Sequence, residues 1–219
     1  LVGGDGQLAF EEKSLYSIEK FLMARRLMYW QVYLHKTSLT AELLLSKTLK
    51  RIRYCYQKGT PPQLSKPLGH FLAQSKFDMP FTDGQLEMFL QLDDADIIQG
   101  LKGWQKEEDR VLAKLSWMLI NRKLLKIKVQ NDPFLPKTLE RKYARLSGNG
   151  FSQEAFDYFV FTGEISNQTF VPLDKEIFIL NKKGKLKRIQ EVDPFFNSEE
   201  LSQLQQKYFL CFPKVKHLL

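Results

Sequence analysis

The sequence predicts a mainly α-helical fold with a smaller α+β portion at the C-terminal end: a long helix and a helical bundle, then short antiparallel strands. From Ser14 to Tyr56 the chain is rich in leucine and contains no glycine or proline, which favours one long helix. After residue 150, apolar and polar residues alternate over short segments, as is typical of strands. We therefore expect a helical body at 1–150 and a small α+β subdomain at 151–219.

The composition is that of a globular protein with a real core, since 43% of the 219 residues are apolar. The net charge of +8 favours anionic partners. Two distant cysteines, Cys55 and Cys211, argue against a disulfide framework and favour a reducing cytoplasm. No apolar run approaches the roughly 18 residues of a membrane span. Because the chain lacks an initiator Met and opens in an apparent strand, we expect it to be a piece of a longer protein.

The N-terminal elements are expected in the following order. Residues 1–13 predict a β-hairpin with its turn at Asp5-Gly6, and Ser14 is placed to cap the long helix. A bend near Thr37-Ser38 is expected within this helix. The segment 58–62, with Gly59 and two prolines, ends it.

The rest of the body is expected to consist of further helices and one strand. A short helix is expected within 62–78, and two further helices should begin at 82–84 and 92–96. A helix at 107–122 is followed by a strand at 123–129, and the last helix of the body begins at Pro136. In the C-terminal portion we expect strands at 158–162, 170–172, 177–180, 186–189 and 208–212, a turn at 183–185 and a helix at 198–206.

One helix face carries an unusual set of side chains. Arg25, Tyr29, Tyr33 and Lys36 are spaced i, i+4, i+8 and i+11, so at roughly 100° per residue they share one narrow arc. An arginine, two phenols and a lysine would suit an anion together with a flat ring, such as a nucleotide. An ordinary structural interpretation stays open, with both tyrosines in the core and the cations reaching solvent at its edge.

Other candidate sites are weaker. Asp93, Asp94 and Asp96 could hold a cation, but acids at the start of a helix favour an N-cap. The three histidines show no metal-ligand spacing, and the glycine-rich segment 1–6 lacks the helix that a phosphate loop requires. Two further basic segments, 121–126 and 182–188, could converge with the helix on a polyanion, or could be solvated edges.

Several motifs resemble one enzyme family. The segment 14–21, then Ala24-Arg25, and the run Val32-Tyr33-Leu34-His35-Lys36 resemble the helix after the catalytic core of HD-domain deoxynucleotide triphosphohydrolases. These are the bacterial dGTPase-like proteins and the vertebrate SAM-and-HD-domain dNTPase. Asn121-Arg122-x-Leu124-x-Lys126 resembles a later motif, and 208–214 resembles the last strand.

The metal-binding core of that family is absent from this chain. The family holds a divalent or transition metal (Mn, Mg, Fe or Zn) with an H…HD…D set, and no such set occurs here. The resemblance therefore implies the C-terminal portion of such a protein, lacking the HD core. The metal would belong to the parent protein, with no metal ligand and no catalytic residue supplied by this chain.

The resemblance also implies roles for individual residues. The arginine matching Arg25 binds substrate phosphate, and the tyrosine matching Tyr33 packs on the sugar or base. The family's effector-nucleotide site at a subunit interface matches Lys13, His35, Lys36, Arg122, Lys126 and Lys182. Departures occur at Glu11 and Gln31, which replace arginines of that site, and at Leu34, which replaces a glutamine near the substrate.

The expected parent is a metal-dependent, cytoplasmic, homo-oligomeric phosphohydrolase acting on deoxynucleoside triphosphates, with no membrane partner. This chain would supply phosphate, nucleotide and oligomer contacts and would be inactive alone. The alternative is a non-catalytic module that binds nucleotides or nucleic acid, for which the +8 charge argues, or that serves oligomerisation only.

Overall fold

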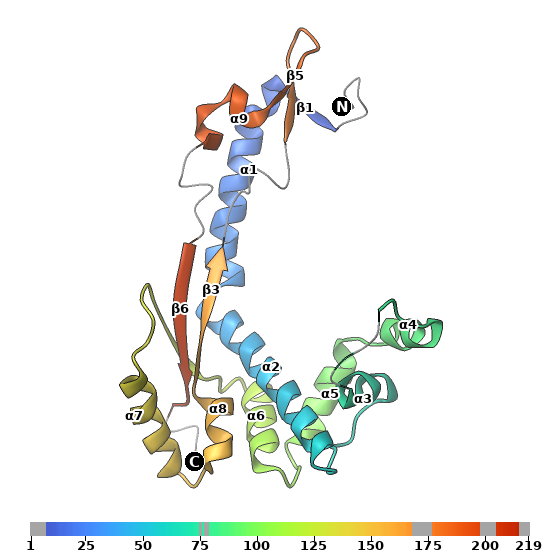
Figure 1. Ribbon diagram of the computed structural model, residues 1–219, viewed down its shortest axis with the longest axis vertical. Helices are drawn as coiled ribbons and strands as arrows, with labels where there is room; N and C mark the ends of the chain where they lie inside the picture. Colours follow the sequence, from blue (N-terminus) through green and yellow to red (C-terminus); the bar gives the residue numbers. More distant parts are fainter. Residues whose placement is uncertain (1–7, 75, 77–78, 168–176, 198–204, 215–219) are drawn as a thin grey trace. The chain divides into compact units, whose positions relative to one another are not determined.

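The computed structural model describes residues 8–74, 76, 79–167, 177–197 and 205–214 (Figure 1). The predicted class is confirmed, since most elements are helices and the strands are short. The chain forms two compact units, one of Leu1–His35, Gln130–Asp132 and Glu164–Tyr208, the other of Lys36–Val129, Pro133–Gly163 and Phe209–Leu219. Both units are discontinuous in sequence, whereas the expected regions 1–150 and 151–219 are continuous.

The first unit packs one long helix and four short helical segments against a small sheet. Its elements are β1 (Ala9–Glu11), η1 (Glu12–Ser14), α1 (Leu15–Met28), η2 (Tyr29–Tyr33), β4 (Phe178–Leu180), β5 (Leu186–Arg188), α9 (Ile189–Val192) and η4 (Pro194–Asn197). Its buried core consists of Ile18, Leu22, Ile179, Ile189 and Phe196. Because Ile18 and Leu22 are four residues apart, they share one face of α1, and this face holds the helix on the C-terminal segments.

The sheet of the first unit has the order β1-β4-β5. β1 pairs with β4 in parallel, with Ala9 opposite Phe178, and β4 pairs with β5 in antiparallel fashion. The strand predicted after the hairpin turn is present as β1, and it pairs with a segment far along the chain, whereas the first strand of the predicted hairpin lies outside the described residues. The turn of that hairpin, Asp5-Gly6, lies outside the described residues as well. The turn at 183–185 is confirmed, with Gly184 at a φ of 73°.

The predicted long helix is interrupted. α1 gives way at Tyr29 to η2, a π-helical segment in which the N–H of Leu34 donates to the carbonyl of Tyr29 over 2.7 Å. Leu34 then leaves the helical region with φ −94° and ψ 13°, and a new helix begins at Lys36. The break lies at Leu34-His35 rather than at a bend near Thr37, because the backbone turns where the π segment ends. Ser14 precedes α1, but its side chain makes no capping hydrogen bond.

The second unit is a helical bundle with a short sheet. Its helices are α2 (Lys36–Gln57), α3 (Lys66–Ala73), α4 (Asp83–Leu90), α5 (Asp94–Trp104), α6 (Arg110–Ile120), α7 (Pro136–Ser147), η3 (Gln153–Ala155) and α8 (Phe156–Phe159). One core cluster gathers Ile52, Leu68, Leu72, Leu101, Trp104 and Leu112. The Trp104 ring nitrogen donates to the carbonyl of Gln63 over 2.8 Å, so this buried indole is satisfied.

Short polar side chains start four of these helices. Thr82 and Gln85 form a capping box at α4, and Asp93 and Asp96 form one at α5. Ser65 caps α3 and Asp109 caps α6. The N-cap interpretation of the acidic cluster is thus confirmed, since Oδ1 of Asp93 accepts hydrogen bonds from the backbone N–H groups of Ala95 and Asp96.

A second sheet has the order β2-β6-β3, formed by Lys126–Gln130, Gln205–Phe212 and Phe161–Asn167. The division into units falls within β3 and β6. Two predictions here are wrong: 156–159 is helical, so the strand begins at Phe161, and Gln205-Gln206 belongs to β6 rather than to a helix. Residues 198–204 and the strand predicted at 170–172 lie outside the described residues.

Candidate functional site

Arg25, Tyr29 and Tyr33 form a continuous stack in the first unit. An Nη2 hydrogen of Arg25 is donated to the Tyr29 hydroxyl over 3.1 Å, and the guanidinium carbon lies 4.9 Å from the Tyr29 ring centre. The Tyr29 and Tyr33 ring centres are 5.1 Å apart, with the planes inclined at 53°. Tyr33 is 53% exposed and Arg25 is exposed, so this is a surface stack and not part of the core.

Lys36 does not extend this stack along the same helix. The predicted arc assumed one continuous helix through Lys36, but the helix breaks at Leu34 and Lys36 opens α2 in the second unit. His35 and Lys36 are both exposed. The i+11 relation therefore fails for Lys36, because the backbone turns before it.

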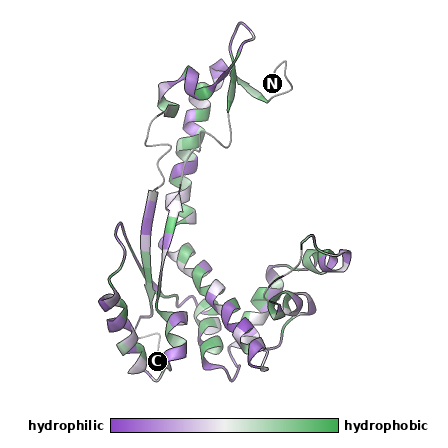
Figure 2. Ribbon diagram, viewed as in Figure 1, coloured by the Kyte–Doolittle hydropathy of each residue, from purple (hydrophilic) through white to green (hydrophobic). Residues whose placement is uncertain are grey.

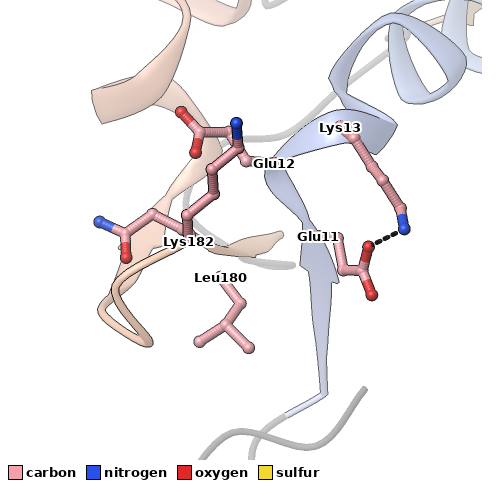
Figure 3. A pocket seen from close by; sticks show the side chains of 6 residues that line it. Glu11, Glu12, Lys13, Leu180 and Lys182 are labelled. Carbon is pink, nitrogen blue, oxygen red and sulfur yellow. Dashed lines mark ion pairs between the residues drawn. The ribbon is translucent and has the colours of Figure 1, made fainter.

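The structure brings Lys13 and Lys182 together in one cleft of the first unit (Figure 3). Its volume is about 780 Å³, and its lining consists of Glu11, Glu12, Lys13, Leu180, Asn181 and Lys182. The side-chain oxygen of Asn181 accepts from the N–H groups of Lys183 and Lys185 at 3.0 and 2.9 Å, which fixes the turn that carries Lys182.

The charge of this cleft is mixed. Lys13 forms an ion pair with Glu11, and Figure 3 shows its side chain directed at that carboxylate. Glu12 supplies a second acid, which the sequence reasoning did not include. Two lysines and two glutamates give a cleft that attracts phosphate far less than two lysines alone would. Glu11 thus offsets the charge of one of the two cations in this cleft.

Arg122 and Lys126 lie in the second unit, at the junction of α6 and β2. Arg122 has a φ of 52° and closes α6, with the N–H of Lys123 donating to the carbonyl of Met118 over 2.9 Å. This six-to-one bond is that of a Schellman motif, in which glycine is the usual residue. Lys126 is exposed at the first position of β2.

The sequence reasoning missed contacts that join distant segments. Lys207 of β6 places its Nζ 4.5 Å from the ring centre of Trp30, the residue that follows Tyr29 in the sequence. Lys128 and Arg145 lie close enough to Lys142 for their positive charges to lower its pKa. Neither group shows a local sequence pattern, because its members come from different elements.

The first unit also exposes large apolar side chains along its main helix. Six residues of α1 and η2 are 38–74% exposed: Tyr16, Phe21, Met23, Leu27, Met28 and Val32. Figure 2 shows apolar positions recurring along α1. At about 100° per residue, Tyr16, Met23 and Leu27 share one side of α1, and Phe21 and Met28 share another, so the helix exposes two apolar stripes of the kind that contact surfaces carry.

The described part of the chain offers neither a metal site nor a membrane span. No group of three or more His, Cys, Asp or Glu side chains is arranged there to hold a metal ion. No helix in that part is both long and apolar enough to cross a membrane.

Comparison with known proteins gives three informative matches. Residues 1–63 match the protein family described as the HD associated region. The crystal structure of a phosphohydrolase from Bacteroides thetaiotaomicron is 38% identical with a TM-score of 0.86, over 96% of this chain and 53% of that chain. The uncharacterized protein YwfO of Bacillus subtilis is 32% identical over 120 residues, which are 55% of this chain and 26% of YwfO.

A hypothetical protein from Aquifex aeolicus shares the fold, with a TM-score of 0.53 at 22% identity over 95% of this chain and 44% of that one. The chain therefore spans about half the length of the Bacteroides phosphohydrolase and about a quarter of YwfO. Together the matches support the predicted relationship of this chain to the HD superfamily and to phosphohydrolases.

Proposed function

We propose that this chain is part of an HD-type deoxynucleoside triphosphate triphosphohydrolase and supplies contacts to the substrate rather than the hydrolytic centre. The observation that carries the proposal is the exposed stack of Arg25, Tyr29 and Tyr33. The likeness to a phosphohydrolase over nearly the whole chain supports the reaction class.

The stack has the chemistry that a nucleoside triphosphate requires. The Tyr29 hydroxyl accepts one N–H of Arg25 and so orients the guanidinium, which keeps further N–H groups for phosphate oxygens. Tyr33 exposes about half of its surface and can pack on a sugar or base. A cation for the phosphates and a ring for the nucleoside are thus joined through Tyr29.

Hydrolysis would take place on residues outside the described part of this chain. A metal in an HD core would supply an activated water and a Lewis acid for the triphosphate. Within the described residues no set of ligands suits that metal. The exposed Phe21 and Met28 lie within about 60° of Arg25 on α1 and are suited to packing against such a core, which would bring the stack to the edge of the catalytic pocket.

The remaining predicted residues would contact a second nucleotide or a neighbouring subunit in a homo-oligomer. Lys13 and Lys182 share a cleft, which supports a joint role. The Glu11–Lys13 ion pair predicts weak affinity for a polyphosphate at this cleft. His35, Lys36, Arg122 and Lys126 are assigned to this role by the family resemblance.

The test is binding of dGTP to the 219-residue chain, measured by isothermal titration calorimetry. Arg25→Gln removes a charge-assisted hydrogen-bond donor, for which about 1.5–3 kcal/mol and thus roughly 10- to 150-fold weaker binding is expected. Lys20→Gln, which removes one exposed cation from the same helix, is the control and should change the Kd by less than about twofold.

Two results would contradict the proposal. Equal binding by Arg25→Gln and Lys20→Gln variants would show that only overall charge matters. Hydrolysis of dGTP by residues 1–219 with added manganese, at rates typical of enzymes, would show that the chain contains its own hydrolytic centre.

A further inference from the structure

Four cations gather on one surface of the second unit, and we name this group the α7–β2 basic patch: Lys126, Lys128, Lys142 and Arg145. The first two come from β2 and the last two from α7. Lys126, Lys128 and Arg145 are exposed and Lys142 is partly buried. None of the comparisons assigns a role to this surface.

Local geometry explains how each element contributes two cations. In β2 the burial alternates, with Ile127 buried between exposed Lys126 and Lys128, so both lysines lie on the outer face, about 6.6 Å apart along the strand. In α7, Lys142 and Arg145 are three residues apart and are neighbours on one side of the helix. Lys137 and Arg141 fall on the same arc, whereas Glu140 falls outside it.

Lys142 joins the two pairs. Its Nζ lies 3.7 Å from the ring centre of Phe212, the last residue of β6, which is the strand next to β2. Partial burial lowers the pKa of Lys142, and the positive charges of Arg145, Lys128 and Lys126 lower it further. The other three cations therefore lie close enough to Lys142 to repel its positive charge.

No carboxylate balances this repulsion within the part of the chain that the structure describes, where none of the four cations forms an ion pair with an acid. Elsewhere in the second unit, the buried Arg51 is paired with Asp109. The lack of an acidic partner is therefore a feature of this patch and not of every cation in the unit. A ligand with several closely spaced negative charges would relieve the repulsion at all four positions together.

We propose that the α7–β2 basic patch binds the phosphate backbone of nucleic acid, independently of sequence. Repeating phosphates are the anions that match cations spread over a strand and an adjacent helix. The aromatic ring within the patch, Phe212, is buried beneath Lys142 and cannot stack on a base. Binding would therefore rest on phosphate contacts, with duplex and single strands both accepted.

The test is fluorescence anisotropy of a labelled 20-nucleotide DNA, single-stranded and duplex, at several salt concentrations. The double variant Lys142→Gln/Arg145→Gln should bind at least tenfold more weakly at about 50 mM salt. The slope of log K against log salt concentration should become shallower by about 1.8 for the duplex and about 1.4 for the single strand, if each lost cation removes one phosphate contact. Lys183→Gln/Lys185→Gln removes two exposed lysines from the turn in the first unit and should change the Kd by less than about twofold.

Further variants separate this proposal from its alternatives. Lys128→Gln, on the exposed face of β2, should also weaken DNA binding, which guards against misfolding of the α7 variant. Arg25→Gln should leave DNA binding unchanged, because that residue belongs to the proposed triphosphate site. Equal loss in the α7 and turn variants, or no salt-dependent binding by the unmodified chain, would overturn the proposal.

Discussion

Asp109 joins two elements of the second unit, and its replacement is expected to be among the most damaging single changes there. Its Oδ1 accepts from the N–H of Leu112 at 2.7 Å, which caps α6. The same carboxylate takes three hydrogen bonds of 2.7–3.1 Å from the Arg51 guanidinium on α2. The Arg51 side chain is only 9% exposed, so Asp109 provides the balancing charge for a nearly buried cation.

The cost of Asp109→Ala follows from these two roles. Loss of an N-cap costs about 1 kcal/mol. Breaking a buried ion pair costs about 3–5 kcal/mol, because the remaining charge is left uncompensated. Asp109 is 23% exposed and Arg51 also lies over the rings of Tyr54 and Tyr158, at 4.2 and 5.1 Å, which reduces the loss. We expect a destabilisation of about 3–5 kcal/mol.

Urea unfolding followed by far-UV circular dichroism measures this cost, and two matched variants divide it. Asp93→Ala removes a cap from α5 without breaking an ion pair, so about 1 kcal/mol is expected. Asp109→Asn keeps a good capping residue but removes the charge, so it should fall between the two alanine variants. If Asp109→Ala costs no more than Asp93→Ala, the pair with Arg51 contributes nothing and the reasoning is refuted.

The same pair predicts a dependence of stability on pH. Burial raises the pKa of Asp109, but the hydrogen bonds from Arg51 and Leu112 outweigh it and hold the pKa below its ordinary value of 3.8. A depressed folded-state pKa stabilises the protein above the unfolded-state pKa, and this contribution is lost as the pH falls below about 4. The free energy of unfolding of Asp109→Asn should therefore decline less between pH 5 and pH 2, roughly, than that of the unmodified chain.

Three further outcomes are expected. In α5, Gly103→Ala should raise the free energy of unfolding by about 0.5–1 kcal/mol, because its added Cβ meets nothing within 4 Å. Gly100→Ala should lower the free energy of unfolding by about 1–3 kcal/mol, because its Cβ would lie 2.3 Å from the Trp104 ring. Arg122→Gly should stabilise by about 0.5–1 kcal/mol in urea unfolding, by relieving a positive φ. Burial raises the pKa of Cys211 to about 12, so its alkylation by iodoacetamide at pH 8 should be slow until urea is added.

Features encoded over three or four residues could be predicted from the sequence. The capping boxes that begin with Thr82 and Asp93 are examples, since cap and backbone partner lie within one turn. The association of Arg25 with Tyr29 is another, because an i, i+4 pair meets on any helix. The turn at Gly184 follows from the freedom of glycine to adopt a positive φ.

Features that depend on distant residues could not be predicted. β1 finds its partner at Phe178, and no local pattern distinguishes that pairing from a hairpin. A strand is predicted at 158–162, yet Tyr158 and Phe159 end the helix α8, and Phe159 is fully buried. The α7–β2 basic patch likewise depends on Lys142 reaching Phe212, seventy positions later in the chain.

The π-helical segment η2 has a consequence for comparing this chain with its relatives. A π turn closes its hydrogen bond over one more residue than an α turn does, so it is equivalent to a one-residue insertion within a helix. Deleting one residue between Tyr29 and Tyr33 would allow an ordinary α turn and leave the following residues in nearly the same direction relative to Arg25. The number of residues between Arg25 and Tyr33 therefore suits a helix that contains a π turn. In a relative without the π turn, the tyrosine that occupies the same place in space would stand one position earlier in an alignment.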